Sequence, residues 1–303
     1  MIHIGAIIVT YHPDFDLLRQ QLVMLSDQVS DMLIVDNTGY DMVNSWVKLQ
    51  AIPGVAVFAN SKNLGLGAAH NIGIDWAKTK GYKYVLLLDQ DSIPERDMVF
   101  QLMHALILLE KEGKNVSAVG PLCRDMKSGA SFPFRRFGWF NTRRIFCDGK
   151  RDLIAVDFLI TSGSLIPLKA LTTTGGMNED LFIDHVDTDW FLRAACLGMR
   201  PWGVCNAYMR HTLGEVSHRL WFFGWRSFFH NKPFRYYYIF RNSIIIWQKS
   251  YAPIKWISGD IVRVAALALS VVLFGPNRFV CVRMILSGIA DGLRRKGGKQ
   301  RTL

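Results

Sequence analysis

The sequence contains few cysteines, and their arrangement does not suggest that they stabilise the fold. The five are Cys123, Cys147, Cys196, Cys205 and Cys281. They are scattered along 303 residues, their number is odd, and no two form a C-x-x-C pair. We therefore expect neither a disulfide framework nor a zinc site, and this usage is typical of a reducing compartment such as the cytoplasm.

The sequence also lacks a secretion signal and a long apolar run. The N-terminus has no basic segment, and Ile4–Thr10 already has the character of a first core strand. A helix needs about 20 apolar residues to cross a bilayer. The longest candidate, Val264–Phe274, is shorter than that and follows Arg263. The sequence therefore predicts no ordinary membrane span.

Acidic residues are scarce in the last part of the chain. From Arg219 onward there are 15 lysines and arginines, and the only acids are Asp260 and Asp291. The preceding residues are near neutral, although the whole chain has a net charge of +11. We therefore expect a first domain over residues 1–218 and a basic, amphipathic region over residues 219–303.

Aromatic and basic residues are mixed at the start of that region. They are Arg219, Trp221, Phe222, Phe223, Trp225, Arg226, Phe228, Phe229 and Lys232. This mixture is typical of a membrane interface, where lysine and arginine meet anionic headgroups. It also occurs in proteins that stack single-stranded nucleic acid, or in a subdomain that packs on a larger domain. We favour contact with an anionic membrane surface and expect no nucleic acid partner.

Apolar runs without alternation recur between amphipathic segments along the first half of the chain. The runs that predict strands are 5–10, 32–35, 55–59, 84–88 and 117–120. The segments that predict helices are 15–29, 40–50, 67–80 and 98–112, followed later by 180–197, 255–274 and 278–293. This alternation predicts an α/β fold with a doubly wound, mostly parallel sheet and a helical C-terminal appendage. Residues 124–150 show no period, and we expect an irregular excursion there.

Polar residues stand where several of these strands end. They are Thr10-Tyr11, Asp36-Asn37, Asn60 and Asp89-Gln90-Asp91. Ligands of open α/β sheets bind outside the carboxyl ends of the strands. Two carboxylates at Asp89 and Asp91 could share a hard cation with the phosphates of a substrate, because Mg²⁺ takes few protein ligands. A D-x-D at a strand end is also common as an acidic turn, so this motif alone is not specific.

Two further segments are candidates for ligand contact. Residues 63–71 (NLGLGAAHN) form a glycine-bearing loop that leads into a helix, which suits close approach of a phosphate or hydroxyl group. The loop matches neither a Walker motif nor a dinucleotide fingerprint, and a tight loop–helix junction explains it equally well. Residues 184–189 (DHVDTD) carry three acids at a predicted helix start, more than capping requires, so one of them could be a general base.

Taken in order, these segments resemble a known family. The matching pieces are IIVTY, VDN, NLGLGAAHNIG, LLLDQDS, TSGSLIP, LFIDHVDTDWFLRA, HTLG and YYYIFRN, within about residues 4–245. The set resembles family 2 glycosyltransferases of the GT-A fold, and within them the bacterial rhamnosyltransferases. The resemblance implies an inverting hexosyltransferase, with dTDP-rhamnose as donor. It also implies an acceptor glycan on a polyprenyl diphosphate, as in O-antigen or other lipopolysaccharide synthesis at the inner face of the plasma membrane.

The resemblance also implies roles for single residues. The nucleotide sugar would be bound by Thr10, Tyr11, Asp36, Asn63, Gly67, Asn71, Asp89 and Gln90. Asp91 and His211 would hold Mg²⁺ or Mn²⁺. Many relatives have a Glu-Asp pair in the acidic segment, and Val186 replaces its first member, so Asp187 becomes the expected base with Asp184 and Asp189 as rivals. Arg241-Asn242 also matches the family, without an assigned role.

Other functions remain open at this point. HAD-type phosphohydrolases place D-x-D after a buried strand, but they carry Thr or Val where this sequence has Ile93, and three strands precede the motif here. Sugar nucleotidyltransferases have a related fold, yet residues 11–14 (YHPD) lack their basic, glycine-rich turn. A non-enzymatic membrane-associated protein is the third alternative.

Overall fold

The structure is a computed structural model. It describes residues 3–126, 128–211, 216–221, 225–229 and 232–300, with only the backbone for 216–221 and 225–229. Several residues of the mixed aromatic and basic segment, including Phe222 and Phe223, therefore lie outside the described residues.

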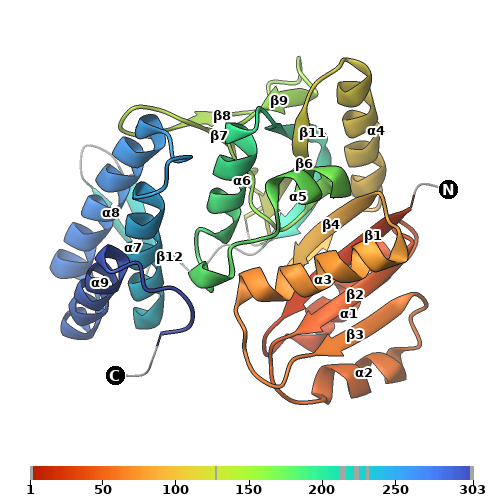
Figure 1. Cartoon of the computed structure of the whole chain (residues 1–303), viewed down its shortest axis with the longest axis horizontal. Helices are drawn as coiled ribbons and strands as arrows, with labels where there is room; N and C mark the ends of the chain where they lie inside the picture. Colours follow the sequence, from red (N-terminus) through yellow and green to blue (C-terminus); the bar gives the residue numbers. More distant parts are fainter. Residues whose placement is uncertain (1–2, 127, 212–215, 222–224, 230–231, 301–303) are drawn as a thin grey trace.

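The first half of the chain forms four parallel strands joined by helices (Figure 1). The elements are β1 (Ile4–Thr10), α1 (Phe15–Leu25), β2 (Asp31–Asp36), α2 (Met42–Gln50), β3 (Val55–Ala59), α3 (Leu66–Lys80) and β4 (Tyr84–Asp89). β1 lies between β2 and β4, and Val9 pairs with Val35 on one side and Asp89 on the other. The polar ends of these strands therefore meet at one edge, as the sequence predicts.

The second half extends the same sheet beyond β4 in the order β10, β6, β11 and β5, with β9 beside β11. The elements are β5 (Ser92–Pro94), α4 (Met98–Lys111), β6 (Val116–Asp125), β9 (Leu153–Ala155), β10 (Ser164–Pro167), α5 (Leu168–Thr174), α6 (Val186–Cys196) and β11 (Arg200–His211). β10 is antiparallel to both neighbours, whereas β11 runs parallel to β6. The sheet is thus mostly parallel, as expected.

Each face of the sheet is covered by its own helices. Ile7 and Val9 of β1 pack on a core that includes residues of α3, α5 and α6. Ile8 of the same strand faces the opposite core, which includes residues of α1, α2 and α4. Because strand side chains alternate while both faces are buried, β1 must be apolar throughout, which is why its sequence shows no alternation.

Two short hairpins lie outside the main sheet. β7 (Phe134–Phe137) pairs with β8 (Thr142–Ile145), and β12 (Val216–Trp221) pairs with β13 (Trp225–Phe229). The first hairpin contradicts the expectation of an irregular segment over 124–150. Arginines occupy both of its faces, so its sequence lacks the alternation of apolar residues by which a strand is recognised.

Three C-terminal helices pack together beside the sheet (Figure 1). They are α7 (Pro233–Trp247), α8 (Ile254–Phe274) and α9 (Arg278–Leu293). Gly288 of α9 lets α9 and α7 approach closely, since a Cβ there would lie 2.4 Å from the carbonyl oxygen of Tyr237 in α7. The expected boundary after residue 218 falls inside β12, so we propose that the C-terminal unit begins at α7.

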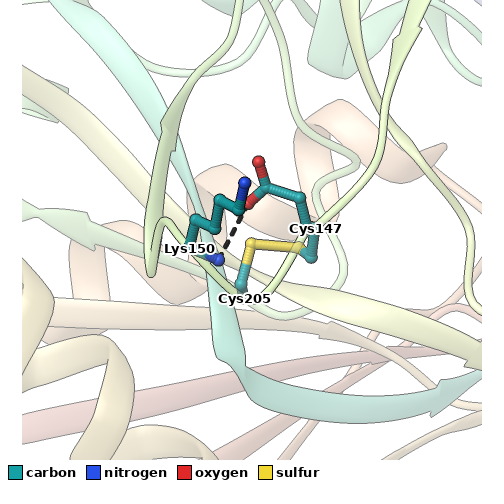
Figure 2. Close-up of a disulfide and its surroundings, with 4 residues drawn as sticks. Cys147, Lys150 and Cys205 are labelled. Atoms are coloured by element: carbon teal, nitrogen blue, oxygen red, sulfur yellow. Dashed lines mark hydrogen bonds between the residues drawn. A yellow bond between two sulfur atoms is a disulfide. The ribbon is translucent and has the colours of Figure 1, made fainter.

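A disulfide joins Cys147 to Cys205, and the expectation that the cysteines are unpaired is wrong for these two (Figure 2). The residues are 58 positions apart in sequence. Their proximity follows from the pairing of β9 with β11, where Leu153 lies opposite Val204, next to Cys205. Cysteine spacing carries no trace of this tertiary contact, which is why the sequence did not reveal it.

Within the described residues, one helix is long and apolar enough to cross a membrane, and it is α8. By length and composition alone, α8 therefore contradicts the expectation that no segment could span a membrane. The apolar run was counted from Val264 because Arg263 precedes it, but Arg263 lies within the helix and pairs with Asp260 at 2.6 Å. One side of α8 packs against α7 and α9, and another side exposes apolar residues such as Leu269 and Leu273.

Candidate active site

A cavity of about 900 Å³ opens at the carboxyl ends of β1 and β4. Its walls include Thr10, Tyr11, Asn37, Asn63, Gly65, Asp89, Gln90, Asp91, Phe182, Asp184, His185, Asp187, His211, Lys232 and Arg235. Most of the candidate residues from the sequence thus line one cavity. They come from segments up to 200 residues apart, which the sheet topology gathers at one edge.

The D-x-D motif lies on the floor of this cavity. The backbone N–H of Tyr11 donates to Gln90 Oε1 at 2.6 Å, which links the motif to the end of β1. Burial and, to a lesser degree, the charge of Asp91 together raise the pKa of Asp89 to about 6, while His211 acts in the opposite direction. Carboxylates that crowd each other in this way are costly as a pair of anions, and a cation between them would relieve that cost.

His211 reaches the same point from β11, because that strand pairs with β5 and places His211 opposite Ser92. Its Nδ1 lies 2.8 Å from Ser92 Oγ and 3.6 Å from Asp91 Oδ1. The buried Ser162 hydroxyl donates to Ser92 Oγ and accepts the N–H of Asp89. If Nδ1 donates to Ser92, Nε2 is free to bind a metal, which is the usual arrangement for a ligating histidine.

The donor set suits a hard divalent cation with only a few protein ligands. The described residues hold no group of three or more His, Cys, Asp or Glu side chains placed to enclose a metal. Asp91 and His211 would be the two ligands from the chain. Mg²⁺ commonly takes one or two carboxylates and completes its shell with water and substrate phosphates, so this open arrangement fits a metal bound together with a diphosphate.

At the end of β1 and β2, Asp36 is buried and organises the polar loop around it. It accepts hydrogen bonds from the hydroxyls of Thr10 and Thr38, both at 2.7 Å. Its second oxygen, Oδ2, is buried and has no partner within the described residues. Asp36 itself does not line the cavity, so the structure places it behind the wall that Thr10 and Asn37 form.

The two other loop residues of the expected donor site lie elsewhere. Asn63 lines the cavity, but Gly67 and Asn71 pack against residues 176–179. The side chain of Asn71 donates to Met177 O and Glu179 Oε1 and accepts the N–H of Met177. These contacts give Asn71 a role in anchoring the loop before the acidic segment.

The acidic segment is held in a strained conformation. Phe182, Asp184 and His185 all have positive φ values, of 62°, 60° and 62°. Non-glycine residues seldom adopt this region, and such strain is concentrated at functional sites. The helix consequently begins at Val186, six residues later than the sequence suggests. Gly65 faces this turn, and the N–H of Leu66 donates to Phe182 O at 2.6 Å.

The three acids of this segment have different environments. Burial raises the pKa of Asp187 to about 6, and its carboxylate lines the cavity while accepting the Thr188 N–H. Asp184 pairs with Arg235 at 2.5 Å. Asp189 is fully buried, where it pairs with Arg193 at 2.9 Å and accepts the Tyr251 hydroxyl. Of the three, Asp187 is the one that faces the cavity without a cationic partner within the described residues.

The Arg241-Asn242 pair of α7 fixes the backbone of that strained turn. Arg241 is fully buried and donates to the carbonyl oxygens of Asp180, Leu181 and Gly298. Asn242 donates to the carbonyl oxygens of Leu181, Ile183 and Asp184. Leu181 O also accepts the Ile183 N–H within the turn, so the two side chains add bonds to it and supply donors to its neighbours. The pair, which matched the resemblance without a role, therefore positions the acidic segment.

The sequence profile of the family described as "Glycosyl transferase family 2" matches residues 6–171, more than half of the chain. The chain belongs to glycosyl transferase family 2. A curated relative, dTDP-rhamnosyl transferase RfbF of Shigella flexneri, is 26% identical over 294 residues, which cover 96% of each chain. This membership removes the phosphohydrolase and nucleotidyltransferase alternatives for the D-x-D motif.

Solved structures share the fold of this family 2 transferase. S. aureus TarS 1–349 in complex with UDP-GlcNAc has a TM-score of 0.59 and 13% identity, covering 97% of this chain and 81% of that one. GalNAc-T7 with UDP, GalNAc and Mn²⁺ has a TM-score of 0.57 and 12% identity. The match covers 91% of this chain but only 58% of GalNAc-T7. Both support a GT-A-type α/β fold.

Several polar residues in or beneath the cavity were not singled out from the sequence as site residues. Ser92 and Ser162 lie beneath Asp89 and His211, and Lys232 and Arg235 form part of the wall at the start of α7. The serines lie within the LLLDQDS and TSGSLIP pieces of the resemblance, so the sequence pointed to these positions but assigned them no role. The two cations lie in the basic C-terminal region, for which the sequence favoured a membrane surface, and only the fold brings them into the cavity.

Proposed function

We propose that this family 2 transferase is a metal-dependent, inverting rhamnosyltransferase that uses dTDP-rhamnose. The acceptor is a glycan carried on a polyprenyl diphosphate in bacterial surface polysaccharide synthesis, such as that of O-antigen. The observation that carries the proposal is the convergence of Asp89, Asp91, Asp187 and His211 on one cavity of a family 2 fold. The choice of rhamnose is supported by the curated relative, which is named a dTDP-rhamnosyl transferase.

The nucleotide end of the donor fits the edge of β1 and β2. Thr10, Tyr11, Asn37 and Asn63 line this end of the cavity, and Asp36 holds the Thr10 hydroxyl from behind the wall. The side chain of Asn37 is held by Asn60 and the Gly65 carbonyl, so the wall is preformed.

The diphosphate end fits the region between the D-x-D motif and α7. Asp91 and His211 would hold Mg²⁺ or Mn²⁺, which when bound neutralises charge on the leaving diphosphate. Lys232 and Arg235 line the cavity and add positive charge. Arg235 is restrained by Asp184, which fixes its guanidinium for the phosphate oxygens.

Asp187 is the proposed general base. Its carboxylate takes the proton of an acceptor hydroxyl, whose oxygen forms a bond to the anomeric carbon of the sugar. The bond between that carbon and the diphosphate oxygen breaks at the same time, so the configuration inverts and the nucleoside diphosphate leaves. A base works best when its pKa lies near the working pH, and burial moves the pKa of Asp187 in that direction, to about 6.

Calorimetry of donor binding tests this proposal. We expect dTDP-rhamnose to bind more tightly than UDP-sugars in the presence of Mg²⁺, and Asp91→Asn to lose the metal-dependent part. Asp75→Asn is the matched control, because Asp75 is exposed on α3, where it pairs with Lys78. Preference for a UDP-sugar would overturn the rhamnose assignment, and absence of any nucleotide-sugar binding would overturn the proposal as a whole.

We further propose that the enzyme lies on the inner face of the plasma membrane without crossing it. Apolar side chains are exposed on the surface of α8 and α9, including Leu273, Phe274, Phe279 and Leu286. Phe279 is 86% exposed, so Phe279→Glu removes apolar contact without disturbing the core. We expect this variant to lose binding to anionic vesicles while its melting temperature stays unchanged. Unchanged vesicle binding would contradict the peripheral location.

The cytoplasmic location carries a separate expectation for Cys147 and Cys205. Disulfides seldom persist in a reducing cytoplasm, so the pair seen in the structure should be present as thiols in growing cells. Alkylation of intact cells before lysis, followed by mass spectrometry, measures this. Recovery of the pair as a disulfide after rapid alkylation would argue against the cytoplasmic face.

A further inference from the structure

A second cavity, of about 500 Å³, lies between the β7–β8 hairpin and the first turns of α8. Its walls include Arg135, Phe137, Phe140, Thr142, Arg144, Phe158, His185, Thr188, Lys255, Trp256, Asp260 and Arg263. The second cavity adjoins the first, because His185 lines both. Thr188, next to the proposed base Asp187, also lines the second cavity. A ligand there would lie on the opposite side of His185 from the donor.

The hairpin that forms one wall carries an unfavourable arrangement of charge. Arg135 lies directly opposite Arg144 across the two strands. Like charges at directly opposed positions destabilise a hairpin. Partial burial lowers the pKa of Arg135, and the positive charge of Arg144 lowers it further. An arrangement that costs stability and serves no packing purpose indicates a function.

Nothing in the described part of the chain neutralises this charge. Arg135 donates to the hydroxyl of Thr142, which is uncharged. No salt bridge within the described residues involves Arg135, Arg144 or Lys255. Arg263, by contrast, is neutralised by Asp260 and donates to His185 Nε2 at 2.8 Å. The cavity therefore has three unpaired cations, and its natural ligand is an anion.

The backbone and the surroundings of the cavity indicate which kind of anion would bind there. Within the described residues no side chain caps the N-terminus of α8, and its first backbone hydrogen bond comes from Trp256, which leaves the N–H groups of Ile254 and Lys255 without a helical partner. Apolar surface adjoins the opening: Trp139 and Phe140 at the hairpin tip are 61% and 69% exposed, and Ile254 of α8 is 74% exposed. The tip is fastened to α8, because Ser258 donates to the Trp139 carbonyl. An anion attached to an apolar chain would match both features.

We propose that this cavity binds the diphosphate of a lipid-linked acceptor, with Arg135, Arg144 and Lys255 as its cationic walls. The proposal rests on the function proposed above and adds the place where the acceptor is held. The lipid chain would lie along the apolar side of α8, and a short glycan would extend past His185 toward Asp187. The phosphate headgroup of a bulk anionic lipid has similar chemistry, and the experiment separates these two sources.

Binding of farnesyl diphosphate to the full-length protein provides the test. The titration is done with excess dTDP and Mg²⁺, so that the donor cavity is occupied. We expect Arg135→Gln/Arg144→Gln to weaken binding at least about tenfold, because it removes charge-assisted hydrogen bonds to phosphate. Arg143→Gln is the matched control, since Arg143 lies on the same strand as Arg144 but is absent from the cavity wall.

A vesicle assay distinguishes the acceptor diphosphate from a bulk lipid headgroup. We expect the double variant to bind phosphatidylglycerol vesicles as the wild type does. Equal weakening for farnesyl diphosphate and for the vesicles would overturn the acceptor assignment in favour of a general headgroup site. Unchanged farnesyl diphosphate binding would overturn the proposal in either case. Lys255→Gln, measured in parallel, should weaken farnesyl diphosphate binding in the same direction.

Folding and donor chemistry are controlled separately. Removal of a like-charge pair should leave the melting temperature equal or higher, so loss of binding cannot be assigned to unfolding. Binding of dTDP-rhamnose by the double variant should equal that of the wild type. If neither protein binds a nucleotide sugar, the proposed function fails while the farnesyl diphosphate result still decides the cavity.

Discussion

The proposed donor side and the proposed acceptor side of this family 2 transferase are built in contrasting ways. The donor side comes from the ends of buried parallel strands, and its polar residues hold one another, as Asp36 holds Thr10 and Thr38. The acceptor side comes from an exposed hairpin and a helix start, and its cations repel one another across β7 and β8. The donor side is thus largely preformed, whereas the acceptor side has a charge imbalance that a ligand would correct.

The contrast shows which features of a site can be recognised in a sequence. Residues after a buried strand are placed by the sheet, so their neighbours in space follow from the topology. Residues on a polar hairpin have no such constraint. The acidic segment over 182–187 lies between the two sides, and residues from α7 hold it in place.

The largest effect should come from replacing the acids of this region. We expect one of them, Asp187, to affect catalysis and another, Asp189, to affect stability. We expect Asp187→Asn to lower kcat by about 10²–10⁴-fold, the usual contribution of a general base, with donor binding unchanged. Asp189→Asn should instead lower stability, since Asp189 is buried against Arg193 and Tyr251. Steady-state kinetics and thermal melting of both variants provide the comparison. Normal kcat in Asp187→Asn would assign the base to another residue.

The sequence predicted the strands around the first cavity more closely than the hairpin beside the second cavity, for physical reasons. Strands such as β1 and β4 were found because both faces are buried, which leaves a continuous apolar run. The β7–β8 hairpin was missed because Arg135, Arg136, Arg143 and Arg144 hide its periodicity. The start of α6 was placed too early, because propensity does not reveal that Phe182 and His185 adopt positive φ. Among the acids, only burial and ion pairs distinguish Asp187 from Asp189.

Arg241 should be the most sensitive structural residue between the two sides. It is fully buried and donates to three carbonyl groups, at Asp180, Leu181 and Gly298. Arg241→Met removes three charge-assisted hydrogen bonds to carbonyl oxygens, and we expect a loss of about 3–4 kcal/mol in the free energy of unfolding. Denaturant titration measures it, with Arg283→Met on exposed α9 surface as the control. A change below about 1 kcal/mol would mean that the acidic segment does not depend on Arg241.

Gly65 joins the donor loop to the acidic segment, and a methyl group there should disturb both. Its φ is 91°, and a Cβ would lie 2.7 Å from the carbonyl oxygen of Phe182. Gly81 is a matched control, because its φ is 73° but a Cβ would meet nothing within 4 Å. We expect Gly81→Ala to cost about 1 kcal/mol from backbone strain alone, and Gly65→Ala to cost more and to raise the KM for the donor. Equal behaviour of the two variants would show that the contact with Phe182 is unimportant.

The pH dependence should be the smallest effect, and its sign distinguishes activity from stability. Burial and the charge of Asp184 raise the pKa of Asp187 to about 6, while hydrogen bonds from Thr188 act in the opposite direction. Because the base must be ionised, kcat/KM should fall about tenfold per pH unit below that value. Asp89 faces the same cavity, and a bound cation would move the midpoint lower.

Stability should respond to Asp187 in the opposite direction. A carboxyl group whose pKa is raised on folding binds more protons in the folded state, so its contribution to stability is present at low pH and is lost as pH rises through about 6. Asp187→Asn removes this cost, and we expect the variant to be more stable than the wild type at pH 7, by about 1–3 kcal/mol. Denaturant titrations of both proteins at pH 5 and pH 7 measure the difference. A gain that is larger at pH 5 than at pH 7 would contradict the assignment, because Asp187 would then be paired and ionised in the folded protein rather than desolvated and ready to take a proton.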